Sequence, residues 1–220
     1  PTFRKEMFPE YKAHRQEVDP ALHEQIPIVK EILEPMGVPV FEYEGFEADD
    51  LIGTLSKQAT EQGVKTLILT GDADQLQLVD DKTSLLMYTG FGDMRTYDPA
   101  AVAEKYDGLG PEYVAEIKAL EGDSSDNIPG VPGIGPKTAS GLLVGVNGGL
   151  TELYANLDIV PTLPIRGAKT LPAKLEEHKE MAFLSYQLAT IKIDVPLDVE
   201  LDDLQMGADD PAKPYALYPL

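Results

Sequence analysis

Seven carboxylates, gathered in three stretches of the chain, are the residues best able to support chemistry. They are Glu47, Asp49, Asp50, Asp72, Asp74, Asp123 and Asp126. Hard oxygen ligands without histidine or cysteine suit Mg²⁺ or Mn²⁺ far better than zinc. The chain has no cysteine, which excludes a disulfide scaffold, a thiolate zinc site and a cysteine nucleophile. Its three histidines, His14, His23 and His178, are isolated and indicate surface positions, so no Ser/His/Asp arrangement is predicted.

An alternation of strands and helices is expected to position these acids. Strands are predicted over residues 38–43, 64–69 and 83–88, and helices over 48–59 and 98–106. The near-continuous apolar run of the second strand is typical of a strand buried on both faces of a parallel sheet. This alternation predicts an α/β domain with a parallel sheet flanked by helices.

The acids fall at or near the ends of these elements. Glu47, Asp49 and Asp50 follow the first strand, Asp72 and Asp74 follow the second, and Asp123 and Asp126 lie in a loop after a helix over 111–121. The carboxyl ends of parallel strands form the edge at which α/β folds bind ligands. We therefore expect the acids to converge on that edge.

Each acidic group also has a purely structural explanation. Acids near the start of a helix are stabilised by its dipole, by about 0.3 to 1 kcal/mol each, which would suffice for Glu47, Asp49 and Asp50. Asp72 and Asp74 could form an Asx turn and a helix cap after Gly71. Asp123 and Asp126 could likewise be loop and cap residues. The occurrence of all seven at element ends favours a cation site.

A glycine-rich segment, Gly130–Ala139, precedes an apolar helix. It lacks the spacing of a P-loop, and Thr138 stands where a dinucleotide-binding fingerprint would need its third glycine. Backbone N–H groups at such a helix start are free to meet a phosphate, with Lys137 as the counter-charge. The alternative is a tight turn between two helices that binds nothing.

The charge of the chain is strongly uneven. Its 220 residues carry 18 basic and 38 acidic side chains, a net charge of −20 that taken alone argues against nucleic acid. Residues 1–15, however, hold four basic residues against two acidic ones, whereas 42–50 hold five acids and no base. That acidic cluster is either solvated or bound to cations. No apolar stretch is long enough to span a membrane, and no signal peptide is evident.

The character of the chain changes after residue 110, where the strand pattern stops. Helices are predicted over 111–121, 136–145, 150–157 and about 172–190, which indicates a helical subdomain over 111–193. Residues 194–220 are acidic and rich in proline and are expected to form a linker, starting with a short strand. Both ends of the chain are expected to have been cut from a longer protein.

Several motifs together resemble the 5′-nuclease (5′–3′ exonuclease) domains of bacterial DNA polymerase I, which are members of the flap endonuclease family. The likeness covers about residues 1–200 and rests on the segments at 1–4, 11–15, 47–55, 70–79, 122–135 and 184–191. The resemblance implies a PIN-like α/β core over 1–110, with a basic arch segment at 1–25 and a helix-hairpin-helix at 127–145. It also implies cleavage of 5′ flaps and RNA primers in replication and repair.

The resemblance implies a role for each group of residues. The seven acids would hold two divalent cations, Mg²⁺ or Mn²⁺, or support the residues that do. The basic residues Arg4, Lys12 and Arg15 would belong to the catalytic arch that threads the 5′ strand. The hairpin would grip the duplex backbone, with a K⁺ ion, through Gly130, Gly133, Ile134, Gly135, Lys137 and Thr138. The expected setting is a monomer linked to a polymerase in the bacterial cytoplasm, associated with the nucleoid, acting on DNA with a 5′ flap, nick or RNA primer and not on a membrane.

The chain departs from the family pattern in ways that weaken the expected activity. Two further metal-site aspartates and the first strand of the sheet would lie upstream of Pro1, and Ala73 stands where many relatives carry lysine. We therefore expect this piece to fold poorly or to cleave weakly. One alternative is a DNA-binding module whose nuclease has been lost by truncation. Another is a small PIN-type ribonuclease, which residues 127–143 disfavour because it would lack the hairpin.

Overall fold

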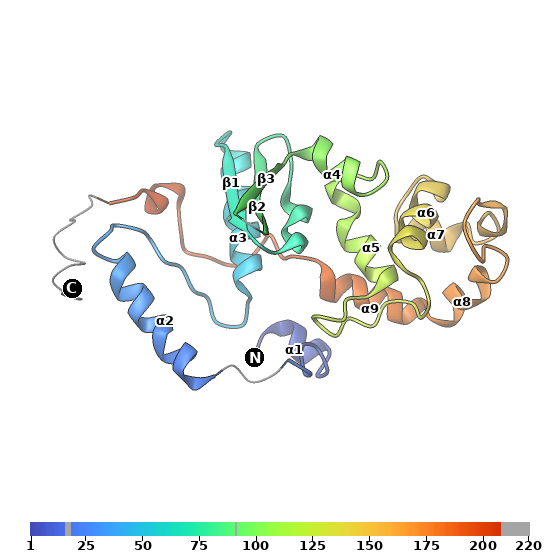
Figure 1. The fold of residues 1–220 in the computed structure, drawn as a ribbon, viewed down its shortest axis with the longest axis horizontal. Coiled ribbons are helices and arrows are strands. Elements are labelled where there is room, and N and C mark those ends of the chain that lie inside the picture. Colours follow the sequence, from blue (N-terminus) through green and yellow to red (C-terminus); the bar gives the residue numbers. More distant parts are fainter. Residues whose placement is uncertain (16–18, 91, 208–220) are drawn as a thin grey trace.

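The computed structural model of the protein describes residues 1–15, 19–90 and 92–207. A small sheet lies near the middle of an elongated molecule, with most of the helices to one side of it (Figure 1). The helices are α1 (Phe3–Met7), α2 (Pro20–Leu33), α3 (Ala48–Glu61), α4 (Pro99–Lys105), α5 (Val114–Glu121), α6 (Pro136–Val146), α7 (Leu150–Ala155), α8 (Leu171–Glu177) and α9 (Lys179–Ala189). The strands are β1 (Thr66–Thr70), β2 (Thr83–Gly90) and β3 (Asp93–Tyr97), and short 3-10 turns are η1 (Ala73–Leu78), η2 (Pro111–Tyr113), η3 (Val160–Thr162) and η4 (Leu201–Leu204).

The sheet is mixed rather than entirely parallel. Strand β2 lies in the centre, parallel to β1 with Ile68 opposite Leu85, and antiparallel to β3 with Leu85 opposite Tyr97. The α/β prediction and the parallel pairing are confirmed. Strand β3 was not predicted, because four of its five side chains are exposed and its residues show no clear apolar alternation.

Only one face of the sheet is covered by the described residues. Ile68 and Leu85 pack there against Leu76 of η1 and Val102 of α4. On β1 the flanking side chains Leu67 and Leu69 are 60% and 69% exposed. The expectation that this strand is buried on both faces is therefore wrong for the part of the chain that the structure describes, because Leu67 and Leu69 remain exposed on the second face.

The strand predicted over 38–43 is also wrong, since these residues belong to no strand or ladder. A strand requires a hydrogen-bonded neighbour, and β1 pairs only with β2 among the described residues. Pro39 has no N–H to donate, and the N–H of Val38 is used by the carbonyl of Leu33 at 3.2 Å. The apolar pattern of these residues could not reveal that a pairing partner is lacking among the described residues.

The predicted helices that follow clear capping residues are confirmed. Asp50 accepts a hydrogen bond from the backbone N–H of Glu47 at 3.0 Å at the start of α3, and Asp98 accepts from Ala101 at 2.8 Å at the start of α4. The single helix predicted over 172–190 is instead two helices, because His178 (φ −108°, ψ 20°) interrupts it. Residues 194–207 contain no strand, which corrects the short strand expected there, and the remainder of that predicted linker lies outside the described residues.

Helix α5 joins two hydrophobic clusters. Val114 belongs to the cluster under the sheet, whereas Ile117 and Leu120 belong to a second cluster formed with α6 to α9. Leu142 and Leu175 are fully buried in that second cluster. Because α5 is fixed at both ends by burial, residues on it and just after it are held rigidly relative to the sheet.

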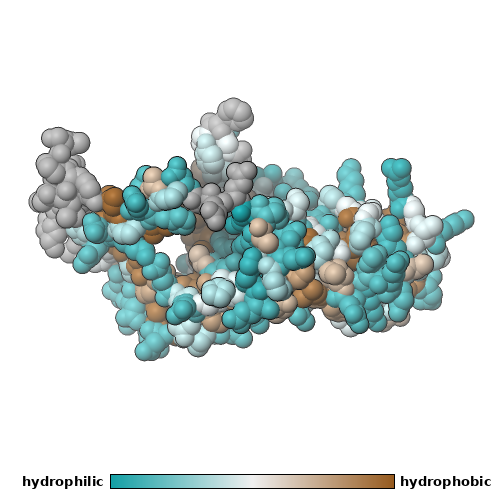
Figure 2. Space-filling view, turned by 90° about the horizontal axis from the view of Figure 1, so that it is seen from below, coloured by the Kyte–Doolittle hydropathy of each residue, from teal (hydrophilic) through white to brown (hydrophobic). Residues whose placement is uncertain are grey.

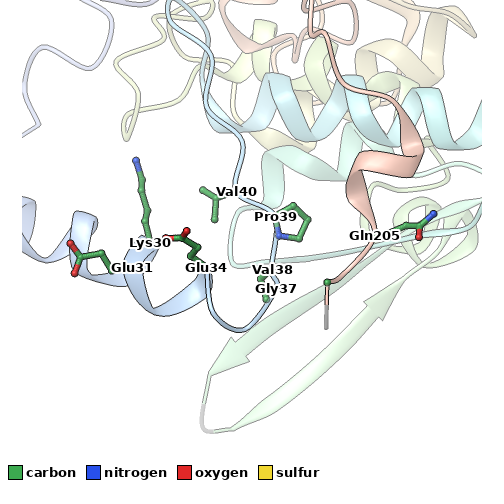
Figure 3. A pocket seen from close by; sticks show the side chains of 9 residues that line it. Lys30, Glu31, Glu34, Gly37, Val38, Pro39, Val40 and Gln205 are labelled. Carbon is green, nitrogen blue, oxygen red and sulfur yellow. The ribbon is translucent and has the colours of Figure 1, made fainter. Parts of the chain in front are cut away.

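The chain after α9 returns across the first half of the molecule. The N–H of Lys192 donates to Asp50 at 2.8 Å and that of Val195 donates to the Thr54 hydroxyl at 3.1 Å. Farther on, the N–H of Gly207 donates to the carbonyl of Gly37 at 2.8 Å. This contact borders a cavity of about 540 Å³ lined by Lys30, Glu31, Glu34, Gly37, Val38, Pro39, Val40, Gln205 and Gly207 (Figure 3). None of the predicted site residues lines it.

Helix α2 has no buried residue and presents Leu22, Ile26 and Val29 to solvent. Seen from below, the surface is mainly hydrophilic with scattered apolar patches, some of them at the end where α2 lies (Figure 2). Among the described helices, none combines the length and the apolar character needed to cross a membrane.

Candidate functional site

The first group of site residues surrounds Lys12. Its ammonium lies 2.9 Å from both carboxylate oxygens of Glu47 and 3.5 Å from Asp126. The buried hydroxyl of Tyr11 lies 3.2 Å from Glu47 and 3.1 Å from Asp126, so its proton is shared between the two acids. Burial and these carboxylates raise the pKa of Tyr11, which keeps it a donor. Three parts of the chain that are distant in sequence therefore meet at one point, namely Tyr11 with Lys12, Glu47 and Asp126.

The backbone of Lys12 is unusual. Its φ is 54°, a left-handed conformation that non-glycine residues rarely adopt, and its N–H donates to the carbonyl of Asp126 at 2.8 Å. Such backbone strain is often found where a side chain must be aimed at a site. The strained turn directs the Lys12 ammonium between Glu47 and Asp126, and Arg15 reaches Asp126 from the exposed side at 2.5 Å.

The second group is centred on Lys118 of α5. Its ammonium forms ion pairs with Asp74 of η1 and with Asp123, which follows α5. Burial alone would raise the pKa of Asp123, but hydrogen bonds from Lys118 and Ser125 lower it to about 2. For Asp74 burial prevails, and its pKa is raised despite Lys118.

Asp49 lies between these groups. Its Oδ1 accepts a hydrogen bond at 2.6 Å from Gln75, which is 3% exposed. Burial raises the pKa of Asp49, Gln75 opposes the shift, and the negative charge of Asp72 adds to it. Asp72 itself is exposed and caps η1 by accepting from the N–H of Asp74 at 2.9 Å. A cation bound nearby would offset these effects and favour the charged form of Asp49.

Arg4 and Asp50 are placed differently from the other predicted site residues. Arg4 is 2% exposed and uses its guanidinium on Asp50, twice at 2.7 Å, and on the carbonyls of Leu188 and Thr190. Asp50 in turn accepts from the backbone of Glu47 and Lys192. As placed, Arg4 does not lie on an exposed arch and Asp50 does not face the other acids, because each satisfies the other in the interior.

Four of the remaining six acids border a common space. A cavity of about 10 Å³, the size of a single water or ion, is lined by Arg4, Tyr11, Glu47, Asp49, Asp74, Asp126, Ile128, Leu188 and Ala189. Across the ranges 1–15, 19–90 and 92–207, however, no three His, Cys, Asp or Glu side chains are grouped so as to hold one metal ion. The acids occur in pairs instead, with Lys12 between Glu47 and Asp126 and Lys118 between Asp74 and Asp123.

The glycine-rich segment forms a turn leading into α6. Gly130 is buried with φ +62°, and a Cβ there would lie 2.3 Å from the backbone nitrogen of Gly122. Ile134 is buried in the helical cluster. Gly133, Gly135 and Lys137 are exposed and Thr138 is half-buried. The segment therefore divides into residues that build the turn and residues that present its backbone to solvent.

Three residues that contribute to this geometry were not singled out as site residues from the sequence. They are Tyr11, Gln75 and Lys118. Tyr11 and Lys12 are adjacent in a basic segment, and that proximity was the available signal. For Lys118 the only signal was a basic residue on a helix directly ahead of an acidic loop. Gln75 had none, since a glutamine within a short turn is unremarkable.

The chain was compared with known families and relatives. Residues 1–107 match the family described as "5'-3' exonuclease, N-terminal resolvase-like domain" and residues 109–212 match "5'-3' exonuclease, C-terminal SAM fold". DNA polymerase I of Pseudomonas aeruginosa is 52% identical over 219 residues, which are 99% of this chain but only 23% of that relative. A 5′-3′ exonuclease of Buchnera aphidicola is 40% identical over 203 residues, or 92% of this chain and 69% of that relative.

Solved structures agree with the sequence comparison. The T5 D15 protein co-crystallised with metal ions superimposes with a TM-score of 0.70 at 27% identity, over 85% of this chain and 69% of that one. The catalytic core of Rad2 in complex with DNA gives a TM-score of 0.60 at 18% identity, over 98% of this chain and 69% of that one, and shows the fold alone. From its two matched halves and these relatives, we conclude that the chain belongs to the 5′–3′ exonuclease family.

Proposed function

We propose that this chain is the 5′ nuclease part of a bacterial DNA polymerase I and that it cuts phosphodiesters at 5′ flaps and RNA primers with the help of divalent cations. The observation that carries the proposal is the meeting of acids from three separate segments, at 47–49, 72–74 and 123–126, with Lys12 and Lys118. The T5 relative at 28% identity is a flap endonuclease that was solved with DNA and metal ions. We place the protein with chromosomal DNA in the bacterial cytoplasm, as its polymerase relatives are bacterial.

The residues fit divalent cations in their chemistry. All the candidate ligands are carboxylate oxygens, and burial raises the pKa of Asp49 and Asp74, so a nearby cation would stabilise their charged forms. Glu47, Asp49, Asp72, Asp74, Asp123 and Asp126 would hold two Mg²⁺ or Mn²⁺ ions. Such ions supply a Lewis acid that activates water and stabilises charge on the phosphate. Asp50 would act by holding Arg4.

The chain's own residues would orient the substrate. Water attacks the phosphorus and the bond to the 3′ oxygen of the preceding nucleotide breaks. The released flap then ends in a 3′ hydroxyl, and the strand that stays in the duplex carries the new 5′-phosphate. Lys12 and Arg15 place cationic groups beside the acids, where they can stabilise the negative charge of the phosphate oxygens. Gly133, Gly135 and Lys137 would contact the duplex backbone, with K⁺ as the expected ion there, and would position DNA without reading its bases.

Cleavage of a labelled substrate tests the proposal. The chain, and a form extended upstream of Pro1, would be incubated with 5′-labelled flap DNA and Mg²⁺, and short labelled products that end in a 3′ hydroxyl are expected. Glu47→Gln, Asp72→Asn and Asp123→Asn should each reduce cleavage at least tenfold, while Glu44→Gln, which changes an exposed acid next to the site, should not. Unchanged cleavage in the three site variants would show that the metal assignment is wrong.

A second candidate, a DNA-binding module without nuclease activity, is favoured by one observation. No three acids are grouped for one ion in the described segments, and Lys12 and Lys118 already satisfy two pairs. The same experiment separates the two. Binding of flap DNA without cleavage by either form would support the binding module, whereas cleavage by the extended form alone would indicate that upstream residues complete the site.

A further inference from the structure

Lys118 occupies a position that a metal ion would also prefer. It projects from α5, and its ammonium contacts one carboxylate from η1 and one from the loop after α5. The three side chains of Lys118, Asp74 and Asp123 are only 15%, 17% and 14% exposed. They therefore form an ion-pair triad that is largely withdrawn from water.

The triad explains how two acids can lie together without a metal ion. Asp74 and Asp123 would repel each other strongly at this separation in a partly buried setting, because charges are weakly screened there. The Lys118 ammonium lies between them and offsets that repulsion. An incoming divalent ion that uses the same oxygens must first displace the ammonium.

The displacement is sterically feasible. Lysine carries its charge on a flexible four-carbon stem with three rotatable donors, so it can move while the backbone stays fixed. The α5 backbone is anchored by Ile117 and Leu120, which are buried in the cluster formed with α6 to α9. Only the Lys118 side chain, which is 15% exposed, would have to swing away.

We propose that Lys118 is a resident cation that holds Asp74 and Asp123 in place until a divalent ion displaces it, and that it thereby sets the metal concentration at which this site fills. The inference rests on the proposed metal-dependent function and deepens it. Lys118 is a positioning residue here, because it acts through Asp74 and Asp123.

Replacement of the ammonium tests this inference by metal binding instead of cleavage. In Lys118→Met the full chain should melt at a lower temperature without metal, because two carboxylates are left unpaired. Its affinity for Mn²⁺, measured from the free Mn²⁺ signal by electron paramagnetic resonance, should rise about tenfold. Mn²⁺ should then raise the melting temperature of Lys118→Met more than that of the parent chain, since binding to the folded state stabilises it.

Controls separate displacement from a general charge effect. Lys118→Arg keeps the charge and should not tighten Mn²⁺ binding. Lys82→Met removes a charge beside Asp81, which is not a site residue, and should leave the Mn²⁺ affinity unchanged. The gain in Lys118→Met should persist at high KCl concentration, because a contact between poorly exposed groups is screened little. If Lys118→Met does not fold, Lys118→Gln provides neutral donors for both acids and should give the same rise in affinity.

The outcomes are distinct. A lower melting temperature with equal or weaker Mn²⁺ binding would show that Lys118 is only structural, and the inference would be overturned while the metal-dependent function stands. If neither the parent chain nor the variants bind Mn²⁺ in the millimolar range, both the inference and the metal part of the proposed function are overturned.

Discussion

The guanidinium of Arg4 donates two hydrogen bonds of 2.7 Å to the two carboxylate oxygens of Asp50, and it joins α1 to α3 through a pair that is almost completely buried. Two further bonds, to the carbonyls of Leu188 and Thr190, extend the connection to the end of α9. One side chain thus ties together three parts of the chain that are far apart in sequence. The acids of the candidate site lie directly beside this connection.

Arg4→Met should therefore destabilise the protein, by about 3–5 kcal/mol in the free energy of unfolding. The reason is that Asp50 would remain buried with only the backbone N–H groups of Glu47 and Lys192 as donors. Urea unfolding followed by circular dichroism measures the change. Lys57→Met, which breaks an exposed pair with Glu61 at 3.7 Å, is the control and should cost less than about 1 kcal/mol. Equal effects of the two substitutions would contradict the assignment of Arg4 as a structural connection.

Asp80 should contribute stability that depends on pH. It accepts hydrogen bonds from the N–H groups of Lys82 at 2.8 Å and Thr83 at 2.7 Å. Burial by itself would raise the pKa of Asp80, but these bonds and the hydroxyl of Thr60 lower it below its model-peptide value of 3.8. Since the folded-state pKa is depressed, the stabilisation is complete above pH 3.8 and is lost as the pH falls through the folded-state value.

The matching variant is Asp80→Asn, which should lower the free energy of unfolding by about 1 kcal/mol at pH 7. The difference from the parent chain should shrink as the pH falls below 3.8, because Asp80 becomes neutral in both states. Unfolding curves between neutral and acid pH measure this. Asp81→Asn alters an exposed neighbour and should have nearly the same free energy of unfolding as the parent chain at any pH. If the loss of stability in Asp80→Asn stays constant with pH, the carboxylate charge of Asp80 contributes nothing to the free energy of unfolding.

Gly130 and Gly135 should respond in opposite ways to alanine. At Gly130, φ is +62° and a new Cβ would lie 2.3 Å from the nitrogen of Gly122, so Gly130→Ala should destabilise the fold by more than about 2 kcal/mol. At Gly135, a Cβ would meet nothing within 4 Å, so Gly135→Ala should cost less than about 1 kcal/mol. Thermal unfolding compares the two directly.

The same pair distinguishes fold from DNA contact. If the backbone at Gly135 meets phosphate as proposed, Gly135→Ala should weaken binding to duplex DNA at least threefold while the protein stays folded. Fluorescence anisotropy with a labelled duplex measures this. Unchanged affinity would remove Gly135 from the proposed DNA contact surface.

Lys137 is exposed at the start of α6, and its removal should weaken DNA binding in a salt-dependent manner. In Lys137→Ala the slope of log K against log salt should decrease by about 1, as expected for the loss of one phosphate contact. Anisotropy titrations between about 50 and 200 mM KCl provide the slope. The matched control is Lys65→Ala, which removes an exposed charge just before β1. An identical slope for Lys137→Ala and the parent chain would argue against a phosphate contact at Lys137.

The sequence was most informative where a pattern is local. Helix α3 was predicted from the helical spacing of its apolar residues and α4 from the cap at Asp98, whereas β1 and β2 were predicted because apolar residues are concentrated there. The segment at 38–43 has an equally apolar pattern, but strand formation depends on a neighbour that no local pattern reveals. Helix α2 was not predicted, since Pro27 lies within it and none of its residues is buried.

The site was predictable in its residue types but not in its pairings. Acids of three segments were expected at one edge of the sheet, and two of them, Glu47 and Asp126, meet at the hydroxyl of Tyr11. That Asp50 would turn inward toward Arg4, or that Lys118 would lie between Asp74 and Asp123, depends on how α1 and α5 pack against α3 and η1. Such contacts join residues that are distant in the chain, and no spacing rule anticipates them.

The return of residues 191–195 onto α3 limits how family members can be recombined. A chimera that takes residues 1–107 from this protein and the remainder from a relative would have to recreate the bonds from Lys192 to Asp50 and from Val195 to Thr54. Both bonds use backbone N–H groups, so they tolerate exchanged side chains but not a shift in chain length. Natural insertions or deletions between α9 and this crossing are therefore expected to be rare, whereas the loops far from it are free to vary.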